Sequence, residues 1–165
     1  MLGNNLVRTL LGAGHEVLAL ARSREKAARE LGDTEARIVI GDMTDVPGFA
    51  DALAGVDVLF HTAAYFREYY APGDHAAVIE RINVEGTMEL ASAAHARGVG
   101  KMVDTSSAGI IGHQSDGSPG DETTAPSPLM EKNLYIKSKR KVEPLLRRFA
   151  LESGFFIASV LPAWM

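Results

Sequence analysis

The sequence predicts an α/β fold in which helices cover an open, doubly wound parallel sheet. The first observation is that helical and strand periodicities alternate from one end of the chain to the other. The second is that the strand expected at residues 56–64, VDVLFHTAA, is almost continuously apolar, as strands are when both faces of a sheet are covered. Strands that alternate with helices are joined by right-handed crossovers, which makes the sheet parallel.

Helices are expected where apolar residues recur at spacings of three and four. The first helix ends where Gly12 follows its last leucine. In the longest one, Gly86 interrupts the apolar stripe and permits close approach to a neighbouring element. The expected helices are residues 4–11, 24–32, 47–55, 74–97 and 129–153.

Strands are expected in the short apolar runs between these helices. A loop is expected at residues 116–128, DGSPGDETTAPSP, which have no periodicity and are dense in Gly, Pro, Ser and Thr. The expected strands are residues 16–21, 36–41, 56–64, 100–107 and 155–161.

Composition excludes several classes of protein. The 165 residues, 46% of them hydrophobic and 23% charged, are enough for one domain spanning 1–165. A net charge of -4 with both signs interspersed gives no footprint for nucleic acid or an anionic membrane. Without cysteine there is no disulfide framework or thiolate metal site. The longest apolar stretch, FFIASVLPAWM, is too short to span a bilayer, and no secretory pattern is present, so we expect a cytoplasmic protein.

Ligands of doubly wound sheets bind at the carboxyl ends of the strands. The residues that directly follow each expected strand are therefore the first candidates for a functional site. They are Arg22, Asp42, residues 62–65, residues 106–112 and Pro162.

Tyr135 and Lys139 stand four residues apart in an expected helix, so their side chains share a face. An ammonium beside a phenol favours the phenolate, which lets the tyrosine exchange a proton with a carbonyl or alcohol oxygen. Taken alone, the spacing is explained equally well by a catalytic pair and by a surface lysine near a half-buried tyrosine. Ser107 ends the preceding strand, whose carboxyl end faces the same crevice, so the three side chains are expected to converge.

Several segments together resemble the extended short-chain dehydrogenase/reductases, in particular their bacterial dihydroflavonol-4-reductase-like and nucleotide-sugar epimerase branches. The resemblance implies a Rossmann-like fold in which Ser107 orients the substrate oxygen, Tyr135 is the general acid/base, and Lys139 favours its ionised form and holds the nicotinamide ribose. The segments, which run in family order over nearly the whole chain, are GNNLVRTLL, GDMTD, VLFHTAA, NVEGT, DTSSAGIIG, DETTAPSP and YIKSKRKVE.

The same resemblance implies which residues hold the cofactor. It places Asp42 and Met43 at the adenine, and Pro162 near the nicotinamide. Ala63 and Ala64 would line the cofactor channel. The other implied residues are Asn83, which supports the active-site helix, and Leu2 and Gly3, which match the last part of the family's phosphate loop.

The residues after the strand expected at 16–21 favour NADP(H) over NAD(H). NAD sites place a carboxylate there to bind the ribose hydroxyls, whereas an arginine suits the additional phosphate of NADP. Here the strand is followed by Arg22, Ser23 and Arg24, with no acid. The alternative is that both arginines are solvated residues at the start of a helix.

The chain departs from the family pattern at both ends. The family's phosphate loop has three glycines after a first strand, and only Met1, Leu2 and Gly3 match its last part. The chain stops at residues 161–165, where the family continues into a substrate-binding region. We therefore expect an incomplete sheet that lacks its central first strand and leaves two neighbouring strands with unpaired edges. Such a chain would be marginally stable or associate through those edges, and its own activity is in question.

Two lesser features leave alternatives open. Tyr65, Phe66, Tyr69 and Tyr70 form an aromatic segment that either contacts an apolar substrate or packs on the domain's own surface. The five histidines show no metal-binding spacing, so we expect no metal, and His61 at the end of a strand is expected to be a packed residue.

The leading expectation is an NADP(H)-dependent oxidoreductase domain that acts on a small-molecule carbonyl or alcohol. One alternative is an NAD-dependent nucleotide-sugar epimerase or dehydratase, and another is a non-catalytic nucleotide-binding or interaction module. The resemblance also implies a homodimer formed through the helices around residues 74–97 and 129–153.

Overall fold

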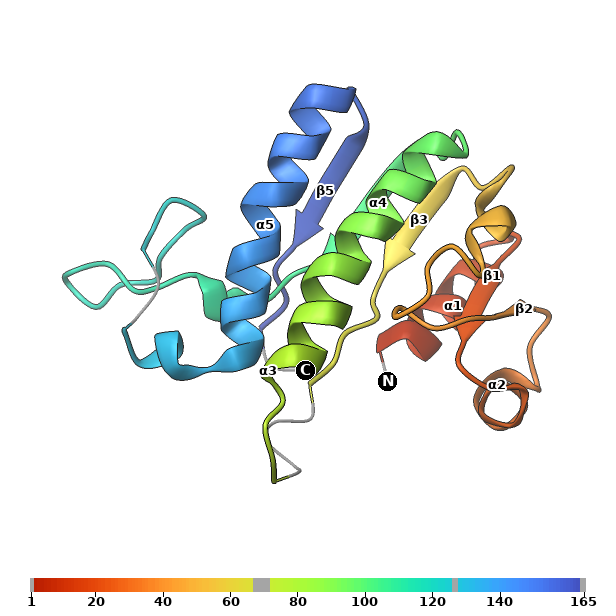
Figure 1. Cartoon of the computed structure of the whole chain (residues 1–165), viewed down its shortest axis with the longest axis horizontal. Helices are drawn as coiled ribbons and strands as arrows, with labels where there is room; N and C mark the ends of the chain where they lie inside the picture. The colour runs from red at the N-terminus through yellow and green to blue at the C-terminus, as the bar shows by residue number, and fades with distance from the viewer. Residues whose placement is uncertain (1, 67–71, 126–127, 164–165) are drawn as a thin grey trace.

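In the part of the chain that the structure describes, five parallel strands alternate with helices, as predicted (Figure 1). The computed structural model describes residues 2–66, 72–125 and 128–163. Strand β1 (Leu18–Ala21) pairs with β2 (Arg37–Ile40), and β4 (Lys101–Thr105) lies between β3 (Val58–His61) and β5 (Phe156–Val160). The doubly wound parallel α/β fold is therefore confirmed.

The sheet is divided into two parts. β1 and β2 form a two-stranded sheet, and β3, β4 and β5 form a three-stranded one. Within the described residues, β1 and β3 each have only one hydrogen-bonded neighbour, and they do not pair with each other. The expectation of two unpaired strand edges in the middle of the sheet is confirmed.

Helices differ from the sequence-based expectation in three places. The helix expected at 74–97 is interrupted by a π-helical turn, the one expected at 129–153 is split before Asn133, and the one expected at 47–55 contains a single 3-10 turn. Asn133 starts the last helix because its side chain accepts a hydrogen bond from the Ile136 backbone N–H at 3.0 Å. The helical elements are α1 (Leu2–Gly12), α2 (Arg24–Leu31), η1 (Ala50–Leu53), α3 (Ala76–Ile79), η2 (Glu80–Glu85), α4 (Gly86–Ala96), η3 (Ala108–Ile110), η4 (Pro128–Lys132) and α5 (Leu134–Ser153).

The core lies between the three-stranded sheet and the helices α4 and α5, which run side by side along it (Figure 1). Its centre is formed by Met102 of β4 and by Val142 and Leu146 of α5, all at most 1% exposed. Gly86 lets α4 approach the loop after β2, since a Cβ at this position would lie 2.5 Å from the Met43 carbonyl oxygen. The close approach expected for Gly86 is therefore confirmed.

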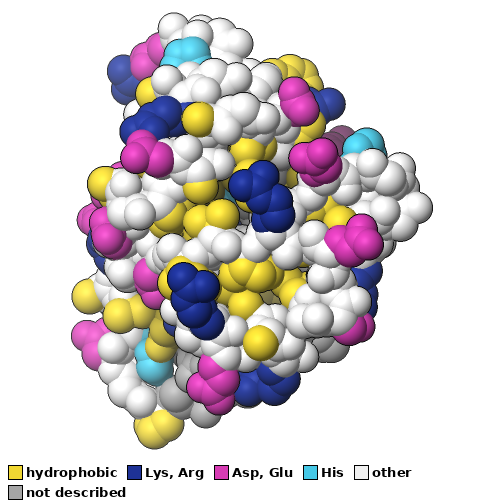
Figure 2. Space-filling model, turned by 90° about the vertical axis from the view of Figure 1, so that its right-hand side faces the viewer, with side chains coloured by type: hydrophobic (Ala, Val, Ile, Leu, Met, Phe, Trp, Pro, Cys, Tyr) yellow, Lys and Arg dark blue, Asp and Glu magenta, His cyan; other side chains and the backbone are white. Residues whose placement is uncertain are grey.

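The two-stranded half buries much less. α1 has no fully buried residue, and α2 buries only Ala27. Figure 2 shows hydrophobic side chains reaching the surface on this side of the molecule. The expectation that both faces of the strand at 56–64 are covered is wrong, because Phe60 remains 36% exposed beside the open edge of β3. The exposed apolar residues of β1 and β2 are Leu18, Leu20, Ile38 and Ile40.

No helix in the part of the chain that the structure describes is long and apolar enough to cross a membrane.

Candidate active site

The loop after β4 places Ser107 at the carboxyl edge of the three-stranded sheet. The Ser107 hydroxyl accepts a hydrogen bond from the Gly109 backbone N–H at 3.2 Å and so caps η3. The Ala108 N–H donates to the Pro162 carbonyl at 3.0 Å, which ties this loop to the end of β5. η3 also packs directly on α5, since a Cβ on Gly109 would lie 2.5 Å from the Ile136 side chain. Ser107 and Pro162 therefore lie together, against the first turn of α5.

Tyr135 and Lys139 occupy the first two turns of α5. The Lys139 ammonium lies 6.0 Å from the centre of the Tyr135 ring and donates a hydrogen bond to the Thr105 carbonyl at 2.6 Å. Lys139 is only 1% exposed, whereas Tyr135 is half-buried. The structure thus gathers the three predicted residues at one edge of the sheet, with the lysine buried beneath the tyrosine. This rules out the reading of Lys139 as a surface lysine.

Burial and charge act against each other at Lys139. Burial lowers the pKa of the Lys139 ammonium, while the carboxylates of Asp104 and Glu143 raise it. Asp104 is fully buried on β4, two residues before the buried Ser106. Sequence reasoning missed Asp104. Its signal is an acidic residue in a strand that is expected to lie in the interior.

Asn83 holds the start of α5 from within the π-helical turn. Its side-chain oxygen, Oδ1, accepts a hydrogen bond from the Tyr65 backbone N–H at 2.7 Å. Its side-chain nitrogen, Nδ2, donates to the Tyr65 backbone carbonyl at 3.0 Å and to the Ser138 hydroxyl at 3.1 Å. Ser138 in turn donates to the Tyr135 carbonyl at 2.7 Å. These contacts fit the supporting role that the resemblance implies for Asn83, and π-helical turns are frequent at functional sites.

The aromatic segment after β3 is partly packed and partly next to Tyr135. The Tyr65 hydroxyl lies 2.9 Å from Nδ1 of His75. The Phe66 ring meets the Tyr135 ring edge-on, with centres 4.6 Å apart. Tyr69 and Tyr70 lie outside the described residues, so the choice between substrate contact and surface packing stays open.

The residues expected at the adenosine follow β1 and β2. Asp42 accepts hydrogen bonds from the Thr44 N–H and hydroxyl, both at 2.9 Å, which hold the pKa of its carboxyl below the usual range. The positive charge of Arg22 lowers this pKa further. The ends of β1 and β2 are in register, Ala21 beside Ile40, so Arg22 and Asp42 lie at the same edge. The Met43 side chain is in the core at 6% exposure, so only its backbone is left to meet an adenine.

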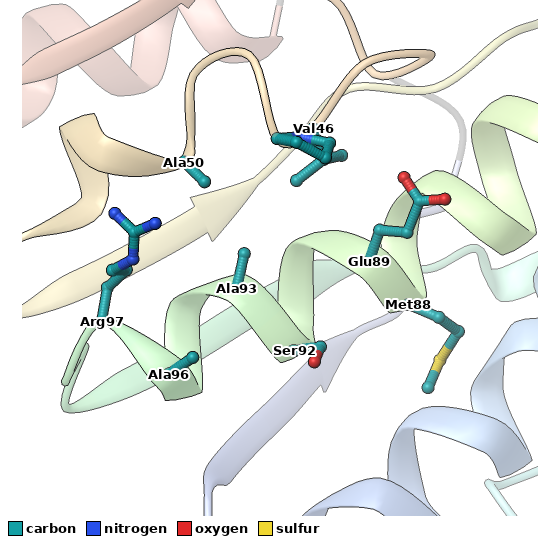
Figure 3. A pocket seen from close by; sticks show the side chains of 9 residues that line it. Val46, Ala50, Met88, Glu89, Ser92, Ala93, Ala96 and Arg97 are labelled. Carbon is teal, nitrogen blue, oxygen red and sulfur yellow. The ribbon is translucent and has the colours of Figure 1, made fainter.

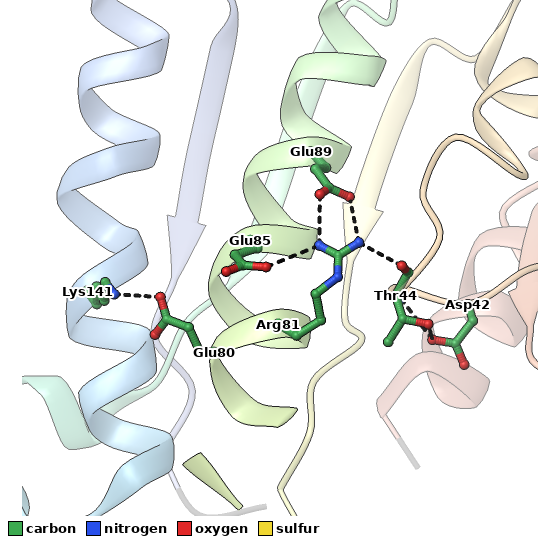
Figure 4. A network of polar contacts seen from close by, with 7 residues as sticks. All are labelled: Asp42, Thr44, Glu80, Arg81, Glu85, Glu89 and Lys141. Atoms are coloured by element: carbon green, nitrogen blue, oxygen red, sulfur yellow. Dashed lines mark hydrogen bonds and ion pairs between the residues drawn. The ribbon is translucent and has the colours of Figure 1, made fainter. Parts of the chain in front are cut away.

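Arg81 fixes the loop that carries Asp42 (Figure 4). Its guanidinium donates to the Thr44 carbonyl at 2.6 Å and to both carboxylate oxygens of Glu89, at 2.8 and 3.1 Å. Glu85 adds an ion pair at 3.6 Å. The sequence analysis missed Arg81, since only the fold brings residue 44 beside residue 81.

The first turn of α1 lies at the carboxyl end of β3. A Cβ on Gly3 would come within 3.1 Å of the Thr62 hydroxyl, so the helix backbone approaches the strand closely here. Leu2 and Gly3 are half-buried, and Ala63 and Ala64 beside them are exposed. A helix start with free N–H groups beside small exposed residues fits the pyrophosphate of a dinucleotide. The residues present therefore fit part of an NAD(P) site.

His61 is packed, as predicted. It is 3% exposed, and its Nε2 lies 3.0 Å from the Thr87 hydroxyl. Among the described residues, no group of three His, Cys, Asp or Glu side chains is placed to hold a metal ion.

A surface hollow between η1 and α4 is separate from this site (Figure 3). In the part of the chain that the structure covers, none of the candidate site residues lines it. Its lining includes Val46, Ala50, Ala93, Ala96 and Arg97.

Comparison with known proteins agrees with this geometry. A model of the NAD dependent epimerase/dehydratase family matches residues 1–164. The chain belongs to this family. The resemblance to the extended short-chain dehydrogenase/reductases is thereby confirmed.

Three relatives illustrate the family. A 3-beta-hydroxysteroid dehydrogenase of Mycolicibacterium neoaurum is 33% identical over 98% of this chain and 44% of its own length. The crystal structure of gox2253 is 34% identical, with a TM-score of 0.77 over 97% of this chain and 47% of that one. The dTDP-glucose 4,6-dehydratase DesIV of Streptomyces venezuelae, solved with NAD, is 28% identical, with a TM-score of 0.77 over 95% of this chain and 51% of its own. The chain thus spans about half the length of the relatives it matches.

Proposed function

We propose that this chain carries the redox site of an NADP(H)-dependent dehydrogenase or reductase that acts on a small-molecule carbonyl or alcohol. The observation that carries the proposal is a lysine with 1% exposure whose ammonium lies 6.0 Å from the centre of the Tyr135 ring. Burying a cation costs free energy. A positive charge on Lys139 beside Tyr135 favours the ionised form of the tyrosine phenol. That is the property that proton exchange with a substrate oxygen requires.

Each residue of the site has a distinct task. Tyr135 donates a proton to the substrate oxygen in reduction and accepts it in oxidation, while the Ser107 hydroxyl donates a hydrogen bond to the same oxygen. Lys139 supplies the positive charge and has further N–H donors for the nicotinamide ribose. The nicotinamide, when bound, supplies the two-electron redox chemistry.

The remaining cofactor residues lie along the carboxyl edge of both sheets. The N–H groups at Leu2 and Gly3 would hold the pyrophosphate, Ala63 and Ala64 would leave room for the chain of the cofactor, and Pro162 would line the nicotinamide site. Arg22 would bind the additional phosphate of NADP, because it is exposed and residues 22–24, directly after β1, include no carboxylate. Asp42 and the Met43 backbone face the adenine.

A relative's name and the surroundings of Tyr135 support a proposal for the substrate class. The relative from M. neoaurum is named for a hydroxysteroid. In this chain the Phe66 ring lies against Tyr135 and forms an apolar wall beside the proton donor. A secondary alcohol or ketone on an apolar ring system is therefore the proposed substrate.

A second candidate is a nucleotide-sugar dehydratase or epimerase with permanently bound NAD. The likeness to DesIV, 28% identical and solved with NAD, favours it. The same tyrosine, lysine and serine would serve this reaction. NAD that stays with the purified chain would favour this candidate, whereas exchangeable NADP(H) favours the first.

The test has a binding arm and a catalytic arm. A nucleotide that binds only the native state raises the midpoint of thermal unfolding. For the 165-residue chain, NADPH should raise this midpoint more than NADH does at equal concentration, because Arg22 is proposed to bind the additional phosphate. NADPH oxidation with a 3-oxosteroid as probe should fall by about 10²- to 10⁴-fold in Tyr135→Phe, with NADPH binding retained.

Matched variants control the catalytic arm. Lys139→Met should lose the activity, and Lys137→Met, at an exposed position of the same helix, should keep it. No stabilisation by either nucleotide would overturn the cofactor assignment. Full turnover in Tyr135→Phe would overturn the role of the tyrosine.

A further inference from the structure

A group of buried polar side chains lies beneath Lys139, between β3 and β4 on one side and α4 and α5 on the other. Asp104 of β4 is 0% exposed, and neither of its carboxylate oxygens has a hydrogen-bond partner among the described residues. Glu143, one turn after Lys139 on α5, has a buried oxygen, Oε2, in the same condition. Buried charged oxygens without donors are costly, so the structure needs a reason to keep them there.

His61 does not supply the missing charge. Its Cα is the register partner of that of Asp104, but its Nε2 is 4.0 Å from the Asp104 carboxylate. The hydroxyl proton of Thr87 is donated to the Asn83 carbonyl at 3.0 Å, so the same hydroxyl accepts from Nε2 of His61. Nε2 of His61 therefore carries a proton. Burial and the nearby Lys139 lower the pKa of His61 to about 3, which favours the neutral ring.

Lys139 is left as the cation that faces the two acids. Its ammonium uses one donor on the Thr105 carbonyl, directly after Asp104 in the chain. Burial raises the pKa of the Asp104 carboxyl, and the Lys139 charge opposes this rise. The Glu143 carboxylate adds to the rise at Asp104. Burial lowers the pKa of the Lys139 ammonium, and the carboxylates of Asp104 and Glu143 act against this by favouring its protonated form.

We propose that Asp104 is a positioning residue whose buried carboxylate, supported by Glu143, holds Lys139 in its protonated state and so keeps a positive charge beside Tyr135. The inference rests on the proposed function for the catalytic role of Tyr135. The effect of Asp104 and Glu143 on the charge beside Tyr135 does not depend on that function. The Asp104 carboxylate on β4 favours the positive charge of Lys139 on α5, and this charge in turn favours ionisation of the Tyr135 phenol.

The test follows ionisation of Tyr135 in the chain without any nucleotide. Near-ultraviolet absorbance reports tyrosinate, and subtracting the titration of Tyr135→Phe isolates this residue from the other three tyrosines. Asp104→Asn keeps the shape and removes the charge. It should move the difference curve to higher pH by about half to one pH unit, a three- to tenfold change in proton concentration. Glu143→Gln should move it the same way by less.

Two further variants make the result specific. Asp57→Asn, at an exposed position just before β3 and at the opposite end of the strand, should leave the curve unchanged. Lys139→Met should move the curve to higher pH, and Asp104→Asn should add nothing in the Lys139→Met background, because the acid acts only through the lysine. If Asp104→Asn does not fold, Glu143→Gln carries the same test.

An unchanged curve in both Asp104→Asn and Glu143→Gln would overturn the inference, as would an additive effect in the double variant. The outcome is separable from that of the proposed function. A shifted curve without nicotinamide-dependent turnover would support the role of Asp104 and Glu143 and overturn the redox assignment. Turnover that depends on Tyr135, with an unchanged curve, would do the reverse.

Discussion

The three-stranded and the two-stranded sheets are built from similar short parallel strands, yet they differ in what they bury. One face of β3, β4 and β5 packs against α4 and α5 to form the core, with Met102 and Leu146 almost inaccessible to solvent, while Phe156 and Val160 of β5 stay exposed. β1 and β2 leave Leu20 and Ile40 about two-fifths exposed. The contribution of a parallel strand to the core therefore depends on cover by a helical layer and on a central position in the sheet. Strand composition matters less.

The same division separates the residues proposed for proton exchange from those proposed to select the cofactor. Ser107, Tyr135 and Lys139 lie in the well-packed half, where a buried cation can be held in place. Arg22 and Asp42 lie in the more open half, at the ends of β1 and β2. The Arg81 guanidinium joins the halves through the Thr44 carbonyl.

The largest expected effect is on stability. Leu146→Ala should lower the free energy of unfolding by about 2–5 kcal/mol, because it leaves a cavity at a fully buried position. Leu20→Ala, at 41% exposure, should cost less than about 1 kcal/mol. Urea unfolding followed by circular dichroism measures both. Equal losses would contradict the difference between the two halves.

The second prediction concerns acid stability of the three-stranded half. The folded-state pKa of His61 is about 3, against an ordinary value of 6.5, so between these pH values the unfolded chain binds a proton that the folded chain does not. The free energy of unfolding should therefore fall as the pH drops through this window, by at most about 1.4 kcal/mol per pH unit from this residue. Asp104, whose folded-state pKa is raised, acts with the opposite sign above pH 3.8.

The contribution of His61 is isolated by His61→Gln, which keeps an amide donor for Thr87 and does not titrate. The slope of unfolding free energy against pH should be smaller in this variant, measured from pH 7 to 4.5 in urea. His113→Gln, at an exposed histidine, should keep the original slope. Identical slopes in all three proteins would contradict the assignment.

The third prediction tests the open half. Arg22→Ser should weaken NADPH binding by about tenfold and leave NADH binding unchanged, because the arginine is expected to contact only the additional phosphate. Titration calorimetry with each nucleotide measures this. Arg29→Ser, at an exposed position of α2, is the control. Equal losses for both nucleotides would place Arg22 away from that phosphate.

The smallest effect is expected where the halves meet. Arg81→Gln should weaken binding of both nucleotides by about two- to threefold, because the loop of Asp42 loses its anchor on α4. Arg148→Gln removes a similar pair with Glu152 on α5 and should have no effect. A loss confined to NADPH would assign Arg81 to the phosphate instead of the loop.

The sequence by itself determined the order of helices and strands, the break in the sheet and the family. Alternating periodicities are local and strong, so they survive without tertiary information. The residues after each strand could also be named in advance, because parallel strands all end at one edge. Boundaries were less certain where local hydrogen bonds compete, as at the Asn133 cap.

Only the tertiary structure decided which polar residues meet. Lys139 and Thr105, which share a hydrogen bond, are 34 positions apart, and Thr44 and Arg81 are 37 apart, so no spacing rule joins them. At the π-helical turn, the Asn83 side chain bonds to two other segments, which local propensity does not encode. A buried charge is defined by what surrounds it in space, and that is set by how the helices pack on the sheet.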